Sequence, residues 1–195
     1  MFSSSYHFVT RWRVEGTPQE VYTILDEPLD LPRWWPSVYL DVREEQTPRG
    51  QVYHLLTKGW LPYTLRWEFR RTEKVPFERM ALEARGDFVG AGVWTIRADG
   101  RCVEVVYDWR VRADKPVLRY LSFLLRPIFA PNHRWAMTKG EESLRLELAR
   151  RRAQADEERR RIPAPPGPTT TSSVPLLAGL IGVLAVIGMA AQWLL

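Results

Sequence analysis

The sequence predicts an α+β fold with one antiparallel sheet, one long helix near the C-terminus and an apolar segment after it. Three observations predict it. A series of short segments alternates between apolar and polar residues, and turn residues separate them. Residues 132–161 repeat small and apolar side chains at helical spacing. Residues 174–195 form a stretch of 22 residues without a charged side chain.

The first predicted elements are a strand and two short helices. Tyr6–Glu15 alternates between an apolar face and a mixed face, which is typical of a strand with one wet side. Thr17 is expected to cap a helix, because Pro18 suits the first helical position and Glu20 completes a capping box. Asp30 is expected to cap a further helical turn in the segment LPRWW.

Six more strands should follow, and together they predict an antiparallel sheet that is covered on one side only. The period-two signal is sharpest in the third and the sixth of them, where large apolar residues alternate with charged ones. The predicted strands are Val38–Glu45, Gly50–Lys58, Thr64–Glu73, Arg79–Gly86, Phe88–Arg97 and Cys102–Arg112.

The long helix is predicted to run from Asn132, as its N-cap, to Arg161. Met137, Leu144 and Leu148 recur at helical spacing and form an apolar stripe that needs a surface to lie on. Strands are the only such surface in the sequence, so the helix should pack on the sheet.

An apolar segment, residues 116–130, precedes this helix, and Pro127 and Pro131 are expected to keep the two apart. It is interpreted as lid-like, and ordinary core packing is an equally weighted alternative. The side chains available to close over a ligand are Leu121, Leu124, Leu125 and Phe129.

The chain divides into a folded domain (1–149), a basic helical extension (150–161), a Pro/Thr/Ser linker (162–173) and a transmembrane helix (174–195). The linker composition favours an extended spacer, with a reach of roughly 37 Å. About 20 apolar residues are enough to cross the hydrocarbon core. The protein is therefore expected to be a single-pass, tail-anchored membrane protein, with the arginine-rich side and the domain facing the cytoplasm.

The charge distribution argues against nucleic acid as a partner. The formal net charge is +5, and residues 150–161 hold six Arg against three acidic residues. That leaves 5 − 3 = +2 for the folded domain, whereas a nucleic-acid binder would carry its excess there. The basic excess beside an apolar tail is better explained as a signal for membrane topology or lipid headgroups.

Catalytic motifs are missing from the sequence. The single Cys102 excludes an internal disulfide and a cysteine-based zinc site, and the three histidines share no motif spacing. The glycine-rich run 86–92 lies between strands, which fits a hairpin and not a nucleotide site. Acidic residues fall on the wet faces of strands. No cofactor and no metal are expected, and a binding protein is favoured over an enzyme.

The candidate ligand-binding residues are mostly large rings at inward strand positions. Aliphatic side chains fill most small cores, so a ring-rich interior favours a cavity for an apolar ligand over plain packing. His133 could bond a ligand hydroxyl or carbonyl, and a surface position is the alternative. The full set is Trp34, Trp67, Phe69, Trp94, Tyr107, Trp109, His133 and Met137.

Two segments carry a family resemblance: TPQEVY followed by LPRWWP near the start, and HRWAMTKGEESL on the last helix. With this order of elements, residues 6–149 resemble the SRPBCC superfamily, which includes START lipid-transfer domains, coenzyme Q-binding proteins and polyketide cyclases. The resemblance implies a helix-grip fold, in which a curved sheet wraps the long helix around an apolar cavity.

The resemblance also implies the function classes. The leading hypothesis is binding of a lipid, sterol-like molecule or quinone, with transfer or presentation at the membrane. The alternative is an enzyme of the polyketide cyclase or hydratase type that uses the same cavity. A third hypothesis is an interaction module without a ligand.

Overall fold

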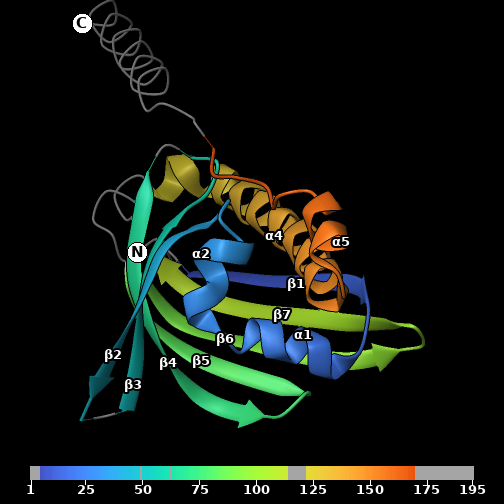
Figure 1. Ribbon diagram of the computed structural model, residues 1–195. Coiled ribbons are helices and arrows are strands. Elements are labelled where there is room, and N and C mark those ends of the chain that lie inside the picture. The colour runs from blue at the N-terminus through green and yellow to red at the C-terminus, as the bar shows by residue number, and fades with distance from the viewer. Residues whose placement is uncertain (1–4, 49, 62, 114–121, 170–195) are drawn as a thin grey trace, which may run out of the picture.

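The computed structural model describes residues 5–48, 50–61, 63–113 and 122–169. Seven strands form one antiparallel sheet in the order β1-β7-β6-β5-β4-β3-β2, and it curves around a long helix (Figure 1). The strands are β1 (Ser5–Glu15), β2 (Tyr39–Thr47), β3 (Gly50–Lys58), β4 (Thr64–Val75), β5 (Arg79–Gly86), β6 (Phe88–Asp99) and β7 (Cys102–Ala113). The helices are α1 (Pro18–Leu25), a 3-10 turn η1 (Pro28–Asp30), α2 (Leu31–Trp34), α4 (Ser122–Arg152) and α5 (Asp156–Arg161).

The predicted strands are confirmed to within two residues at either end, because their limits depend on local signals. Neighbouring strands along the chain from β2 to β7 pair as hairpins, and β1 pairs with β7 at the other edge. The turn at Gly100 has φ of 63°, a left-handed conformation that glycine adopts without strain. The apolar face of the sheet is concave and faces α4 (Figure 1).

The predicted capping box at the start of α1 is present. The Thr17 hydroxyl accepts a hydrogen bond from the Glu20 amide at 3.3 Å, and the Glu20 carboxylate accepts one from the Thr17 amide at 2.8 Å. The predicted cap at Asp30 is wrong. Its side chain makes no cap hydrogen bond and accepts one from Arg33 at 2.8 Å instead.

The long helix differs from its prediction at both ends. It begins at Ser122 and runs through Pro127 and Pro131, so neither proline ends it. A proline removes one backbone donor and bends a helix, but packing can hold the turns on either side together. The helix then ends at Arg152, and residues 156–161 form the separate helix α5.

Asn132 is not an N-cap. It lies inside α4, where its side-chain oxygen accepts a hydrogen bond from the Trp60 amide at 3.0 Å. It therefore fastens the β3–β4 connection to the helix.

The predicted stripe on this helix is buried against the sheet. Met137, Leu144 and Leu148 are 5%, 0% and 2% exposed and belong to one core cluster with residues of β1, β6 and β7. Gly140 lies in the same stripe, and the Trp35 indole occupies the place where a Cβ would be. The observed architecture is therefore the α+β helix-grip arrangement.

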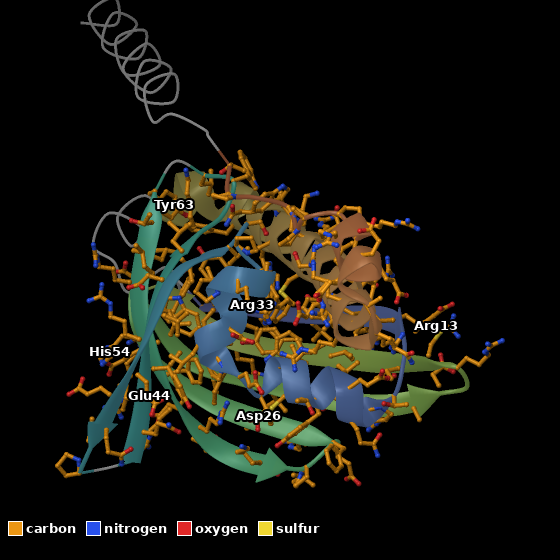
Figure 2. All side chains as sticks on the ribbon, in the orientation of Figure 1. Arg13, Asp26, Arg33, Glu44, His54 and Tyr63 are labelled. Carbon is orange, nitrogen blue, oxygen red and sulfur yellow. The ribbon has the colours of Figure 1, made fainter. Side chains whose placement is uncertain are left out.

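An ion-pair cluster fixes the C-terminal half of α4 to α2. Glu147 is 1% exposed and accepts hydrogen bonds from Arg33 at 2.8 Å and from Arg151 at 2.8 Å. Figure 2 shows Arg33 reaching from α2 toward α4. Burial raises the pKa of Glu147, but the hydrogen bonds from the two arginines outweigh it, and the pKa is lowered.

The linker is not the free tether that its composition suggests. Residues 162–169 return along α4 (Figure 1), and Ile162, Pro165 and Thr169 are half-buried. Within the described ranges no helix is apolar enough over a sufficient length to cross a bilayer. The membrane helix predicted at 174–195 lies outside the described residues and gains no support from them.

Candidate functional site

A cavity of about 130 Å³ lies between the N-terminal half of α4 and the concave face of the sheet. Its walls come from the sheet, from the segment after α2, from the β3–β4 connection and from α4, and the strands that contribute are β1, β2, β3, β4, β6 and β7. The lining residues are Tyr6, Phe8, Trp35, Val38, Tyr39, Thr57, Lys58, Gly59, Tyr63, Leu65, Trp67, Phe88, Tyr107, Trp109, Val111, Phe129, Asn132, His133, Ala136 and Met137.

Five of the eight predicted site residues line this cavity: Trp67, Tyr107, Trp109, His133 and Met137. Trp67 and Tyr107 also line a second cavity of about 60 Å³ farther along the sheet, together with the predicted Phe69 and Trp94. Trp34 lines neither cavity. It is 0% exposed and lies in the core beside Trp35.

Four rings separate the two cavities and belong to the walls of both: Trp35, Tyr39, Trp67 and Tyr107. We call this set the aromatic partition. Trp35 and Tyr39 meet edge to face at 5.1 Å between ring centroids. Tyr107 stacks between Trp94, at 4.0 Å, and Trp109, at 5.6 Å. The rings are held by one another more than by aliphatic packing, so the interior presents flat apolar faces.

Two glycines make room for these rings. A Cβ on Gly92 would lie 2.5 Å from the Tyr107 hydroxyl oxygen and 2.8 Å from the Trp109 ring, so only glycine lets both rings lie flat on β6. Gly140 does the same for Trp35 on α4. The glycine-rich run 86–92 therefore has the structural role predicted from its place between strands.

The sequence-based set missed several lining residues. Tyr6 and Phe8 lie on the predicted inward face of β1, so the alternation of that strand could have found them. Trp35 and Tyr39 lie on either side of a proline-containing turn, where no periodicity tells which ring points inward. In the lid-like segment, Phe129 lines the cavity and meets Tyr6 edge to face at 5.3 Å. Leu121, Leu124 and Leu125 lie outside the side chains that the structure describes.

His133 contributes a neutral imidazole to the wall. It stacks on Phe8 with centroids 4.2 Å apart, and its Nε2 lies 3.4 Å from the Thr10 hydroxyl. Burial lowers the pKa of His133 from 6.5 to about 4, so the ring is uncharged at neutral pH. His133 is half-buried and borders both the cavity and an outer groove beside β1, so its role toward a ligand stays a prediction. A neutral imidazole offers one hydrogen-bond donor and one acceptor.

Two tyrosine hydroxyls add neutral donors. Burial raises the pKa of Tyr39 and of Tyr107 above the usual value of a phenol, so both stay protonated. Among the described residues, the structure gives neither hydroxyl a protein hydrogen-bond partner. The Trp67 indole, in contrast, donates to the Thr57 hydroxyl at 3.0 Å. The cavity thus combines satisfied groups that hold the wall with neutral groups left for a ligand.

Among the residues that line the cavity, Lys58 alone carries a charge, and we call the end of the cavity that Lys58, Gly59 and Asn132 line its mouth. The acidic residues predicted on wet strand faces are paired there: Glu83 with Arg70 at 2.7 Å and Asp108 with Arg110 at 3.0 Å. In the part of the chain that the structure describes, no cluster of three or more His, Cys, Asp or Glu side chains is arranged to hold a metal ion. The arrangement can orient an uncharged apolar molecule through ring stacking and a few hydrogen bonds.

Comparison with known proteins gives a fold. No protein-family profile and no curated protein matches the chain. Among solved structures, the Zhui aromatase/cyclase from Streptomyces sp. R1128 is similar, with a TM-score of 0.58 and 16% identity over 78% of this chain and 98% of that one. The protein TTHA0849 from Thermus thermophilus gives a TM-score of 0.57 and 16% identity over 71% of this chain and 97% of that one.

The di-domain aromatase/cyclase BexL from the BE-7585A biosynthetic pathway also matches, with a TM-score of 0.55 and 15% identity. The match covers 72% of this chain and 49% of BexL, about half of that di-domain chain. At these identities, what the chain shares with its structural neighbours is the helix-grip fold, which aromatase/cyclases also have.

Proposed function

We propose that the domain binds a flat, largely apolar small molecule in the cavity under α4 and orients it with neutral hydrogen-bond groups. One observation carries the proposal. An aromatic-walled cavity holds two tyrosine hydroxyls that have no protein hydrogen-bond partner among the described residues, and a neutral imidazole whose Nε2 lies near the Thr10 hydroxyl. Buried polar groups are normally paired, so unpaired ones around a cavity favour a ligand that pairs them.

The size of the cavity limits the ligand. An engineered protein cavity of about 150 Å³ accommodates benzene. The cavity of about 130 Å³ is slightly smaller, so as it stands it has room for no more than a single ring. A larger ligand displaces part of the aromatic partition toward the second cavity of about 60 Å³: this holds for the two fused rings of 1-naphthol and even more for a sterol-like molecule or a quinone with a tail.

A second candidate function is cyclisation of a polyketide-like chain, and the aromatase/cyclases among the structural neighbours favour it. His133 would take the proton from a carbon next to a ketone, and Tyr107 would donate a hydrogen bond to a second ketone. The carbon–carbon bond then forms at that carbonyl carbon, whose oxygen takes up the proton. The lowered pKa of His133 makes it a weak base at neutral pH, which favours orientation over proton abstraction as its main role.

Membrane attachment is a further part of the proposal. Residues 174–195 carry no charged side chain, and a span of about 20 apolar residues suits a bilayer. The domain would then lie on the cytoplasmic side, where lipids, sterol-like molecules and quinones dissolved in the membrane are its nearest apolar ligands.

A pair of variants on one helix tests the binding site. Ala136 lines the cavity, whereas Ala149 lies farther along α4 and is exposed. Binding of 1-naphthol is measured by the quenching of tryptophan fluorescence. Ala136→Leu should fill the cavity and lower the affinity for 1-naphthol at least about tenfold, which corresponds to 1.4 kcal/mol. Both variants are made in the full-length chain and measured in one detergent. Ala149→Leu should bind 1-naphthol with the affinity of the wild type, and it serves as the control for partition of 1-naphthol into micelles.

Equal affinity of the two variants would show that 1-naphthol binds elsewhere and would refute the cavity as the site. Incubation of the wild type with a linear poly-β-ketone, followed by mass spectrometry, separates the two functions. A cyclised product that Ala136→Leu fails to make would favour the enzyme, and recovery of the unchanged molecule bound to protein would favour the binder.

A further inference from the structure

The described part of the linker, residues 162–169, is attached to the domain near both of its ends. Arg150 donates a hydrogen bond to the backbone carbonyl of Pro163 near the start of the linker. At its other end, Lys58 Nζ donates to the carbonyl of Thr169 at 2.9 Å, and the Thr169 hydroxyl donates to the carbonyl of Gly59 at 3.1 Å. We call residues 162–169 the strap, because contacts at both ends hold them on the domain.

The strap ends at the mouth of the cavity. Lys58 and Gly59, which form hydrogen bonds with Thr169, both line the cavity. Asn132, which lies beside Gly59, also lines it. Figure 1 shows the chain running from α5 back along α4 to the end where β3 and β4 are joined. The segment predicted to span the membrane starts at residue 174, so four residues separate it from Thr169. Five Cα-to-Cα steps extend to at most about 17 Å, so the length of the chain limits how far from the mouth a membrane span could start.

The rim of the mouth has the chemistry of a membrane interface. Trp60, Tyr63 and Phe129 are half-buried there, and Lys58 adds a positive charge. Trp and Tyr are enriched where protein meets lipid headgroups, because each has an apolar ring and a polar tip. Figure 2 shows Tyr63 at this end of the domain and Arg13 at the opposite end.

The arginine cluster of residues 150–161 is a less suitable surface for contact with lipid than the rim of the mouth. It lies at the other end of α4, about 30 Å from Asn132 at 1.5 Å per residue. Its members are paired within the protein: Arg151 with Glu147 at 2.8 Å, Arg152 with Glu20 at 2.7 Å and Arg160 with Glu157 at 3.0 Å. Arginines that are already paired gain less from anionic headgroups.

We infer that the strap holds the cavity mouth against the lipid surface, so that the ligand passes between membrane and cavity without crossing water. The inference rests on the proposed binding function and on the membrane span predicted at 174–195. It specifies the ligand as a molecule dissolved in the bilayer and the partner surface as lipid. The linker acts as a positioning element.

The test measures which end of the domain touches lipid. The full-length chain carries Cys102→Ser and one added cysteine. The cysteine replaces Trp60 on the rim, the exposed Ala130 next to the rim residue Phe129, or, as the matched control, Arg101 in the β6–β7 turn. Each is labelled with an environment-sensitive fluorophore and reconstituted in vesicles of phosphatidylcholine and phosphatidylglycerol that contain brominated lipid. Quenching at both rim positions should exceed quenching at position 101 several-fold.

A second variant separates the strap from simple anchoring. Insertion of about twenty Gly and Ser residues after Thr169 adds a flexible spacer with an average reach of about 25 Å. Rim quenching should then fall toward the level at position 101, while the protein still floats with vesicles in a density gradient.

Three results would overturn the inference: equal quenching at the two ends, no effect of the insertion, or protein that does not float with vesicles. None of these measurements involves a cavity ligand. The 1-naphthol assay therefore tests the proposed binding function independently of the lipid contact, and either proposal can be refuted without the other.

Discussion

The two halves of α4 are built differently. The N-terminal half borders the cavity with Asn132, His133 and Ala136, and its partners are aromatic rings and neutral polar groups. The C-terminal half is packed on its inward side: Leu144 and Leu148 are 0% and 2% exposed, and Glu147 accepts hydrogen bonds from two arginines. One continuous helix therefore carries a binding surface at one end and a stabilising contact at the other. This separation lets the cavity keep unpaired groups without loss of the fold.

The largest expected effect breaks the stabilising end. Glu147→Ala leaves Arg33 and Arg151 without their shared carboxylate, and breaking a buried ion pair costs about 3–5 kcal/mol. Both arginines are partly exposed and can regain water, so the lower part of that range is expected in urea unfolding. Affinity for 1-naphthol in the absence of urea should stay at the wild-type value. Glu142→Ala, at an exposed position on the same helix, is the control and should cost less than about 0.5 kcal/mol.

The next largest effect is a pH dependence of stability that arises in the N-terminal half of α4, at His133. The pKa of His133 is lowered from 6.5 to about 4 in the folded state. Below pH 6.5 the unfolded chain therefore binds a proton at His133, whereas the folded chain binds it only near pH 4. Its contribution to stability is complete above pH 6.5 and is lost as the pH falls toward 4, at a cost on the order of 2–3 kcal/mol. His133→Gln should abolish this loss when urea midpoints are measured from pH 7 to pH 4.

The stabilising end responds in a lower pH window. The hydrogen bond from Arg152 lowers the pKa of Glu20 from 4.5 to about 2. The contribution of Glu20 is therefore present above pH 4.5 and is lost between pH 4.5 and 2. If the His133→Gln variant lost stability between pH 6.5 and 4 as steeply as the wild type, another group would be responsible for that window.

The smallest effect sharpens the description of the binding end. Tyr107→Phe removes a hydroxyl that has no protein partner among the described residues, so the free energy of unfolding should change by less than about 0.5 kcal/mol. Affinity for 1-naphthol should fall about two- to tenfold, since one hydrogen bond contributes about 0.5–1.5 kcal/mol. Tyr22→Phe removes a hydroxyl outside the cavity and should leave the affinity unchanged. Similar affinities for all three proteins would mean that the Tyr107 hydroxyl does not touch the probe.

The strands and α1 could be predicted closely because their signals are local. Alternation, turn residues and the capping box around Thr17 each act over a few positions, and the sheet follows from them. The limits of α4 could not be predicted in this way. Pro127 and Pro131 are local signals for a break, and contacts made far away in the sequence, such as the one between Asn132 and Trp60, hold the helix across them.

The sequence predicts the kind of residue that lines the candidate site, namely inward-facing rings, but it does not predict every individual residue. Inward rings of β4 and β7 follow from alternation, so Trp67, Tyr107 and Trp109 were found. Whether Trp34 or Trp35 faces the cavity depends on the missing Cβ of Gly140, which lies on another element. The attachment of the strap is likewise non-local, because a proline-rich composition predicts an extended chain and not the surface on which that chain lies.

The first and the last strand of the sheet in chain order pair with each other, and this has a consequence for folding. β1 lies in full register with β7, so Trp12 pairs opposite Val105, almost half the chain away. The strands β2 to β7 form by successive hairpins, each of which closes a short loop, whereas β1 must wait until β7 exists. During synthesis β1 is thus made well before its partner β7 and pairs after the hairpins have formed. Through that interval it presents an unpaired edge and the rings of Tyr6, Phe8 and Trp12, which is the surface that chaperones protect from aggregation.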